Sequence, residues 1–405
     1  MTALRISKTK HGSVSLLVWV FCFSIQASSA GHTNIPKAAG WAERMALTVI
    51  SDHPEAWKMR KSDGAYRWAY TQGLVLYGME RLYRKDGDER YYEYIKAYVD
   101  HYVDEDGVIR TFEIDQFNID SINAGKLLFY LYERTKDKRY LKAIKSLRHQ
   151  LDWHPRTTEG GFWHKRKYPW QMWLDGLYMG APFYAQYEVT FGDIKQLDDV
   201  VKQFVLSESK TRDAKTGLLY HGWDESKIQR WADKDTGLSP SFWSRAMGWY
   251  MMALVDTLDY LPEAYSGRRS LIDILNRLTT ALVKYQDTTG LWYQVTDQGD
   301  RKGNYLEASS SSMFVYAIAK GVRKGYLPGK YKVVAEKGFK GITKHLVDVD
   351  SKTGKMRLKQ ICRSAGLGGD PYRGGSFEYY VNTDIVVNDA HGTGAFILAA
   401  AEMGF

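Results

Sequence analysis

An aspartate among apolar side chains is the first feature of this sequence that suggests chemistry. Asp175 lies within WQMWLDGLYMG, residues 170–180, where the other side chains are aromatic, aliphatic or those of glycine and one glutamine. A carboxylate in apolar surroundings costs free energy unless it is paired, solvated or protonated. Asp175 therefore either caps the helix predicted to begin here, or it stays partly protonated and serves as a proton donor.

A second aspartate, Asp120 in FNIDSINAGKLL, also lies where a helical pattern begins. Taken singly, each aspartate is more simply explained as a helix N-cap. Two like charges that face one cavity, however, favour the neutral form of one of the two carboxyl groups. We therefore predict that Asp175 is the general acid and base and that Asp120 is its electrostatic or positioning partner.

Other side chains in the sequence suit a sugar that carries a carboxylate. Trp173 and Trp249 offer flat apolar faces on which a pyranose ring can stack, although the core is the commoner place for a tryptophan. Arg245, in FWSRAMGWY, is either an ordinary surface arginine or a bidentate carboxylate ligand. His164 in GFWHKRKY and His221 in LLYHGWDE occupy matching places in two predicted loops, but they are not spaced as local metal ligands.

A repeated pair of helices would bring these residues together. Apolar residues recur with a 3.6-residue period in about twelve stretches. These stretches are residues 37–50, 67–84, 88–103, 119–134, 137–152, 171–190, 193–210, 241–260, 268–286, 308–323, 330–346 and 389–403. Short polar turns follow the even-numbered stretches, whereas the remaining connections are long. Most of the long connections contain a glycine followed by a short run that is typical of a β-strand.

This weak repeat of about fifty residues predicts an all-α fold, an (α/α)6 six-hairpin toroid with short rim β-hairpins in the long loops. An open helical solenoid is the alternative, but it needs polar capping repeats and the last predicted helix is too apolar. In the toroid, the inner helices all begin at the long-loop end, where their N-termini suit an anion. The polar residues predicted at those starts are Tyr70, Asp120, Asp175, Arg245, Ser309 and Asp389 with His391.

The first thirty residues have a different pattern. Three basic residues precede the apolar run VSLLVWVFCFSI, and small residues follow it. This pattern predicts a signal peptide over residues 1–30 and export to a periplasm or the cell exterior, with residues 31–405 as a single catalytic domain. Because Cys22 lies in the signal, Cys362 is the only cysteine left, which excludes an internal disulfide and a cysteine metal cluster. Removal of the signal takes away three positive charges, so the formal net charge falls from +9 to +6, which suits either an anionic ligand or simple solubility.

Seven segments, in order along the chain, resemble the unsaturated rhamnogalacturonyl hydrolases of glycoside hydrolase family 105. They are WAYTQG, DSINAGKLLFYLYERTKD, WLDGLYMGAPFYAQY, WSRAMGWYMMALVDTLDYLP, GLWYQVTD, NYLEASSSSMFVYAIAKGVRKGYL and GTGAFILAAAEM. The resemblance implies the same closed ring, no metal or cofactor, and a substrate produced by a polysaccharide lyase. Such a substrate, as in pectin degradation, carries a non-reducing uronic acid with a double bond between C4 and C5.

The resemblance also implies roles for individual residues. Asp175 would protonate C4 and then deprotonate the water that adds at C5, after which the hemiketal collapses and releases the glycosidic bond. Asp120 matches the second family aspartate. The positions that match the family's substrate pocket are Tyr70, His164, Trp173, His221, Arg245 and Trp249. The sequence departs from the family at Ala246 and Met247, where glycine and asparagine are frequent, which leaves the substrate preference open.

Two alternative functions remain open from the sequence. One is an unsaturated glucuronyl hydrolase of the family 88 type, and the other is a non-catalytic oligosaccharide-binding protein. The expected partner is a small acidic oligosaccharide, with no nucleic acid and no membrane anchor once the signal is removed. The sequence leaves open the choice of galacturonic or glucuronic acid, the reducing-side sugar and the oligomeric state, for which a monomer is one option.

Overall fold

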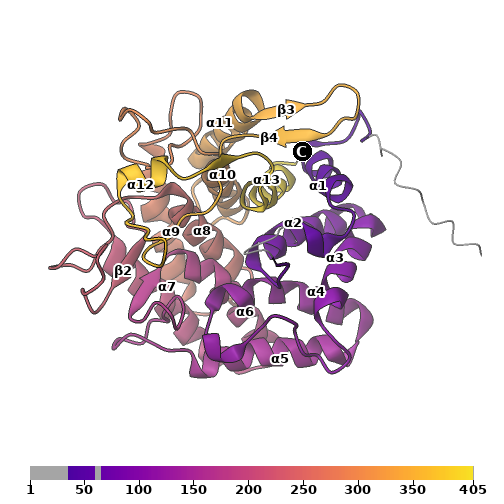
Figure 1. The fold of residues 1–405 in the computed structure, drawn as a ribbon, viewed down its shortest axis with the longest axis horizontal. Helices are drawn as coiled ribbons and strands as arrows, with labels where there is room; N and C mark the ends of the chain where they lie inside the picture. The colour runs from indigo at the N-terminus through magenta and orange to yellow at the C-terminus, as the bar shows by residue number, and fades with distance from the viewer. Residues whose placement is uncertain (1–34, 60–64, 405) are drawn as a thin grey trace, which may run out of the picture. The chain divides into compact units, whose positions relative to one another are not determined.

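Helices arranged in two concentric rings build the fold (Figure 1). This computed structural model describes residues 35–59 and 65–404, so the predicted signal peptide lies outside the described residues. The inner ring consists of α2 (Tyr70–Asp86), η3 (Ile119–Gly125) continued by α4 (Lys126–Thr135), α6 (Asp175–Thr190), α8 (Ser244–Thr257), α10 (Ala308–Arg323) and α13 (Ala390–Glu402). The outer ring consists of α1 (Trp41–Asp52), α3 (Glu89–Tyr102), α5 (Lys138–Trp153), α7 (Leu197–Thr211), α9 (Arg268–Val283) and α11 (Lys332–Gly341).

The inner ring is closed. Each inner helix packs against the next one along the chain, and α13 packs against α2. Each outer helix packs on an inner helix, with α1 placed against α13. The predicted (α/α)6 toroid is therefore confirmed, and the open solenoid is excluded because its two ends would not meet.

Burial follows from the position of a helix in the two rings. All residues of α8, from Ser244 to Thr257, are buried because other helices surround it. In α9, buried residues such as Leu271, Leu275 and Leu278 recur at spacings of three and four, which places them on one face. This single apolar stripe is typical of a helix that faces a core on one side and water on the other.

Short antiparallel strand pairs form on the rim, as predicted. The pairs are β1 (Gln171–Trp173) with β2 (Gly222–Asp224), β3 (Val347–Val349) with β4 (Met356–Leu358), and β5 (Ile361–Cys362) with β6 (Ile385–Val386). One predicted boundary is wrong, because residues 171–173 form β1 and α6 begins only at Asp175. The short helix α12 (Phe377–Val381), in the last long connection, was not predicted.

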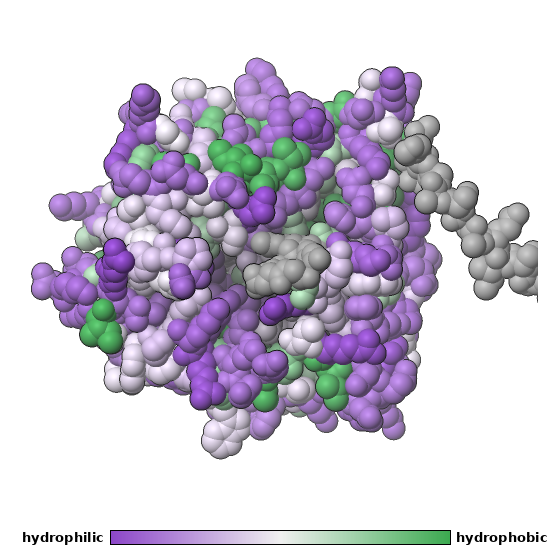
Figure 2. Space-filling view, viewed as in Figure 1, coloured by the Kyte–Doolittle hydropathy of each residue, from purple (hydrophilic) through white to green (hydrophobic). Residues whose placement is uncertain are grey.

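One face of the molecule can be followed in Figure 2. On the face shown in Figure 2, hydrophilic side chains predominate and hydrophobic ones form small separate groups. Among the described residues, none of the helices combines the length and the apolar character that crossing a membrane requires.

The contact that closes the ring depends on a glycine. A Cβ at Gly394 of α13 would lie 2.9 Å from the backbone N of Val75 and 3.0 Å from the backbone C of Leu74. Alanine within a helix normally stabilises it relative to glycine. At Gly394 we expect the reverse, a loss of about 1–3 kcal/mol in the free energy of unfolding, because α13 must move away from α2.

Urea denaturation checks this prediction. Gly329→Ala is the matched control, because a Cβ at Gly329 would meet nothing within 4 Å. The expected result is a lower urea midpoint for Gly394→Ala only. Equal midpoints for the two variants would contradict the tight approach of α13 to α2.

Candidate active site

A cavity of about 210 Å³ opens where the inner helices begin. Residues from the starts of α2 and α6, from η3, from the loop before β1 and from the segment between β5 and α12 form its wall. The lining residues are Arg67, Ala69, Tyr70, Thr71, Gln72, Asp120, His164, Lys165, Tyr168, Trp173, Asp175, Met179, Ser364, Ala365 and Arg373. Five of the predicted site residues, Tyr70, Asp120, His164, Trp173 and Asp175, therefore share one cavity.

Pairing of β1 with β2 places Asp175 beside His221. Trp173 lies opposite Gly222 in this ladder, and the backbone N–H of Leu174 donates to the carbonyl of His221. Asp175 is the first residue of α6, but Leu174 occupies the N-cap position and no side-chain hydrogen bond caps the helix. The N-cap explanation of Asp175 is therefore wrong, and the carboxyl group faces the site instead.

One oxygen of Asp175 lies against the imidazole of His221. Oδ2 is 3.1 Å from Nε2 of His221, although no hydrogen bond joins the two buried atoms. Since the Asp175 side chain keeps 13% exposure while Oδ2 is buried, Oδ1 is the oxygen that can face the cavity. The carboxyl group thus has one edge fixed by protein and one edge open to a substrate.

Tyr380, a residue of α12, fixes the orientation of the His221 ring. Its Nδ1 lies 2.7 Å from the hydroxyl of Tyr380. Burial raises the pKa of Tyr380 well above its ordinary value, so this phenol stays neutral and can donate a proton. Donation to Nδ1 places the proton of a neutral His221 on Nε2, the nitrogen that lies 3.1 Å from Oδ2 of Asp175.

Asp120 has a different environment from Asp175. Its Oδ2 forms an ion pair with Lys165, and its Oδ1 lies 3.3 Å from Nε2 of His164. Burial opposes ionisation, but Lys165 and then His164 lower the pKa of Asp120 below its ordinary value. Asn118, not Asp120, is the N-cap here, because its side chain accepts a hydrogen bond from the backbone N–H of Asp120. Asp120 is therefore a carboxylate at neutral pH.

Stacked aromatic rings form one wall of the cavity. The rings of His164 and Trp173 lie 4.4 Å apart, and those of Tyr168 and Trp173 lie 4.8 Å apart, with interplanar angles of 16° and 20°. Burial lowers the pKa of His164 to about 4, so this imidazole is neutral at physiological pH. Such a wall offers a flat surface to a sugar ring.

A search among known proteins identifies the family. The sequence profile described as Glycosyl Hydrolase Family 88 matches residues 41–404. The chain belongs to glycosyl hydrolase family 88. It is therefore an enzyme that hydrolyses glycosides, which excludes the non-catalytic binding protein.

Two relatives of this family 88 hydrolase support the resemblance found in the sequence. A glycoside hydrolase from family 105 of C. acetobutylicum ATCC 824 is 46% identical, with a TM-score of 0.86 over 90% of this chain and 99% of its own. The unsaturated rhamnogalacturonyl hydrolase YesR of Bacillus subtilis strain 168 is 28% identical over 272 residues, which are 66% of this chain and 73% of that protein. The predicted resemblance to family 105 is confirmed.

A more distant neighbour shares the fold. The unsaturated glucuronyl hydrolase from Bacillus sp. GL1 is 13% identical, with a TM-score of 0.65 over 90% of this chain and 95% of its own.

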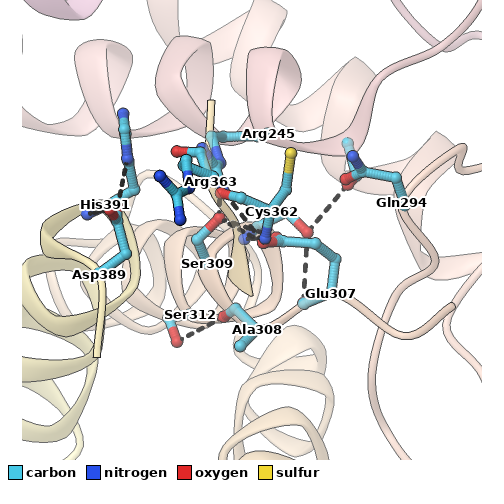
Figure 3. Close-up of polar contacts among 12 residues, drawn as sticks. Arg245, Gln294, Glu307, Ala308, Ser309, Ser312, Cys362, Arg363, Asp389 and His391 are labelled. Atoms are coloured by element: carbon cyan, nitrogen blue, oxygen red, sulfur yellow. Dashed lines mark hydrogen bonds and ion pairs between the residues drawn. The ribbon is translucent and has the colours of Figure 1, made fainter. Parts of the chain in front are cut away.

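Arg245 of this hydrolase does not reach the cavity wall. Its Nε donates to Ser309 at 2.7 Å, and its Nη2 donates to Glu307 at 3.2 Å and to the carbonyl of Cys362 (Figure 3). Arg245 is 1% exposed and Glu307 is 0% exposed. The structure thus differs from the expectation that Arg245 binds the substrate carboxylate, because a buried protein carboxylate already occupies its guanidinium.

Trp249 also lies outside the wall of the cavity. Its ring stacks on Tyr178 at 5.1 Å and meets the edge of Tyr70 at 6.1 Å. Tyr70 is held in turn by His391, whose Nε2 lies 2.8 Å from the tyrosine hydroxyl and whose Nδ1 contacts Asp389. Trp249 therefore packs against Tyr70, a residue of the cavity wall, without lining the cavity itself.

Three basic residues of the cavity, Arg67, Lys165 and Arg373, were not predicted. Lys165 follows His164 directly, so the motif that drew attention to the histidine contained it. Arg373 lies in GLGGDPYRGG, a glycine-rich part of the last long connection, and no periodicity marks it. Loops of this length are often functional, which is the only indication that the sequence offers.

The guanidinium of Arg373 is held by neutral groups. Its Nε donates to the carbonyl of Gly368 at 2.7 Å, and its Nη2 donates to the hydroxyl of Tyr168 at 2.7 Å and to the carbonyl of Leu367 at 3.0 Å. Its Cζ lies 5.8 Å from the centre of the Trp173 ring. Within residues 35–59 and 65–404, no carboxylate forms an ion pair with it. Arg373 is thus a fixed cation beside the aromatic wall.

The described part of the chain offers no metal site of the ordinary kind. Across those residues, no group of three or more histidine, cysteine, aspartate or glutamate side chains could hold a metal ion.

The buried pair of Arg245 and Glu307 gives a prediction about stability. Arg245→Met leaves the Glu307 carboxylate buried without its cation, so we expect a loss of about 3–5 kcal/mol in the free energy of unfolding. Adding Glu307→Gln should restore part of this loss, since glutamine carries no charge. Urea denaturation of both variants measures the effect. An unchanged urea midpoint for Arg245→Met together with a raised KM would instead assign Arg245 to substrate binding.

Proposed function

We propose that this family 88 hydrolase releases the 4,5-unsaturated uronic acid from the non-reducing end of lyase-generated oligosaccharides. The observation that carries the proposal is the pair of unlike carboxyl groups on one cavity. Asp120 is held ionised by Lys165, whereas Asp175 lies beside His221 and forms no ion pair with a lysine or arginine among the described residues. Two carboxyl groups in different environments can take different roles in proton transfer.

Asp175 serves as both acid and base in this reaction. Its protonated carboxyl group donates a proton to C4, which leaves positive charge on C5 and the ring oxygen. The resulting carboxylate then removes a proton from the water that adds to C5, so the enzyme regains its initial state. The hemiketal at C5 opens to a ketone, the hemiacetal at C1 collapses, and the remaining saccharide leaves. One water is consumed for each bond cleaved.

The carboxylate of the uronic acid binds at Arg373. Because protein groups already hold Nε and one Nη of Arg373, its side chain loses little conformational entropy when a ligand carboxylate binds. A hydrogen bond between a guanidinium and a carboxylate is also stronger than one between neutral groups. The position of Arg373 next to Trp173 lets one sugar ring stack on the wall while its carboxylate meets the guanidinium. Asp120, ionised on the same cavity, stabilises positive charge that develops at C5.

The proposed substrate is the unsaturated disaccharide from rhamnogalacturonan, because the relative YesR is described as an unsaturated rhamnogalacturonyl hydrolase. An unsaturated glucuronyl substrate is the alternative. Turnover of disaccharides from rhamnogalacturonan and from glycosaminoglycans, compared at equal concentration, decides between them. We also propose export of the protein, on the basis of the apolar run and small residues within positions 1–30.

Replacement of the acid and base should abolish turnover but not binding. We expect Asp175→Asn to lower kcat by about 10²- to 10⁴-fold, the range that general acid and base catalysis contributes. Loss of the ultraviolet absorbance of the substrate alkene measures turnover, and calorimetry measures binding. Asp106→Asn, at a carboxylate that is 88% exposed, is the matched control. Full activity of Asp175→Asn would overturn the assigned role.

Removal of the Arg373 guanidinium should weaken substrate binding. We expect Arg373→Ala to raise KM by about 10- to 100-fold with little change in kcat, because one charge-assisted contact is lost. The methyl ester of the same uronate should bind wild type and Arg373→Ala almost equally. Arg230→Ala, at an exposed arginine that does not line the cavity, is the control. An unchanged KM in Arg373→Ala would place the uronate carboxylate elsewhere.

A further inference from the structure

A second cavity opens at the opposite end of the inner ring. Its volume is about 800 Å³, and residues near the ends of α2, α6, α10 and α13 line it. This volume is within the range of sites that bind small molecules. None of its lining residues also lines the cavity at Asp175.

Two stacked aromatic rings lie between the cavities. Trp249 touches Tyr70, which lines the cavity at Asp175, and it stacks on Tyr178. The Tyr178 ring in turn lies 3.9 Å from Nζ of Lys126, which lines the second cavity. The two cavities are therefore separate sites on the two sides of this ring pair.

The amino group of Lys126 is buried in the wall of this cavity. The residue is 4% exposed, and its Nζ has no hydrogen-bond partner among the described residues. The rings of Tyr77 and Tyr178, at 4.4 and 3.9 Å from Nζ, are its close neighbours. Burial lowers the pKa of Lys126 to about 7. A buried donor that lacks an acceptor is costly, so the cavity offers a strong position for an anionic ligand atom.

The same cavity also has buried carboxylate oxygens that form no hydrogen bond in the described part of the structure. They are Oε2 of Glu80, which lies 3.7 Å from Nε of Arg81, and Oδ1 of Asp259, which lies 3.4 Å from Nζ of Lys324. The hydroxyl of Tyr130 is also buried and forms no hydrogen bond with the described residues. Carboxylate oxygens of this kind accept hydrogen bonds from hydroxyl groups. A simple anion could accept a hydrogen bond from Lys126 only. An acid that carries hydroxyl groups could also donate hydrogen bonds to the two carboxylates.

The mouth of this cavity is positively charged. Four basic side chains lie there with one acidic residue, Glu402. They are Arg84, Lys85, Arg323 and Lys324. Part of this charge offsets the negative ends of α2 and α10. Arg84 and Arg323 also pair with glutamates, and Nζ of Lys324 lies 3.4 Å from Asp259. The remaining excess attracts anions toward the cavity.

We propose that this second cavity binds a sugar acid, with its carboxylate at Lys126 and its hydroxyl groups donating to Glu80 and Asp259. Tyrosine rings, among them Tyr77 and Tyr130, supply apolar faces for the sugar ring. The site is independent of the reaction proposed for Asp175, since it shares no lining residue with that cavity.

Calorimetric titration of the full chain with D-galacturonate tests this site. We expect a binding event that Arg373→Ala retains and that Lys126→Met weakens by about ten-fold or more. D-galactose, which lacks the carboxylate, should bind at least about ten-fold more weakly than galacturonate. Turnover of the unsaturated disaccharide by Lys126→Met should equal that of wild type, because Lys126 lies outside the catalytic cavity.

Two further measurements keep the test decisive. Lys85→Glu reverses a charge at the exposed mouth, so it tests the site even if Lys126→Met fails to fold. A crystal soaked in galacturonate should show the sugar between Lys126 and Glu80. Galacturonate binding that Lys126→Met and Lys85→Glu leave unchanged overturns the proposal, as does binding that Arg373→Ala removes entirely. Absence of any binding to wild type overturns it as well.

Discussion

The packing of α13 against α2 is the contact on which the rest of the structure depends. The two helices come from opposite ends of the chain, and their contact turns a row of helical hairpins into a ring. In the closed ring, the starts of α2 and α6 and the short helix η3 line one cavity. The close approach at Gly394 shows how little space the contact between α13 and α2 leaves. The geometry of the proposed active site thus depends on the packing of the ring.

Within the closed ring, neighbouring groups give the two aspartates unlike environments. Lys165, from the loop before β1, holds Asp120 ionised, and the neutral His164 lies beside the same carboxylate. The ladder of β1 and β2 sets His221 beside Asp175, and Tyr380 of α12 fixes that histidine from behind. The pairing of β1 with β2, each only three residues long, therefore determines the position of Asp175, the proposed acid and base. Rim loops and inner helices thus both supply residues of the proposed site.

The two ends of the ring differ in electrostatics for a simple reason. Helix starts converge at the cavity that holds Asp175, and helix ends converge at the cavity that holds Lys126. Positive helix ends favour acidic groups, whereas negative helix ends favour lysine and arginine. This polarity fits the excess of basic over acidic side chains around the cavity that holds Lys126. One closed ring of parallel inner helices thereby creates two polar cavities of different character.

The sequence alone determined the helices, their pairing and the residue types at the inner helix starts, because the 3.6-residue apolar period and alternating loop lengths are local properties. It also determined Asp175 and Asp120 as residues to consider, since a carboxylate in an apolar stretch is visible without a structure. The roles of Arg245 and Arg373 were decided only by the tertiary structure. The partner of Arg245, Glu307, lies 62 residues away in the chain, and the cavity reaches Arg373 from a segment that carries no periodic pattern. Long-range packing decides that Arg245 pairs with a protein carboxylate and that Arg373 lines the cavity. No local sequence pattern contains this information.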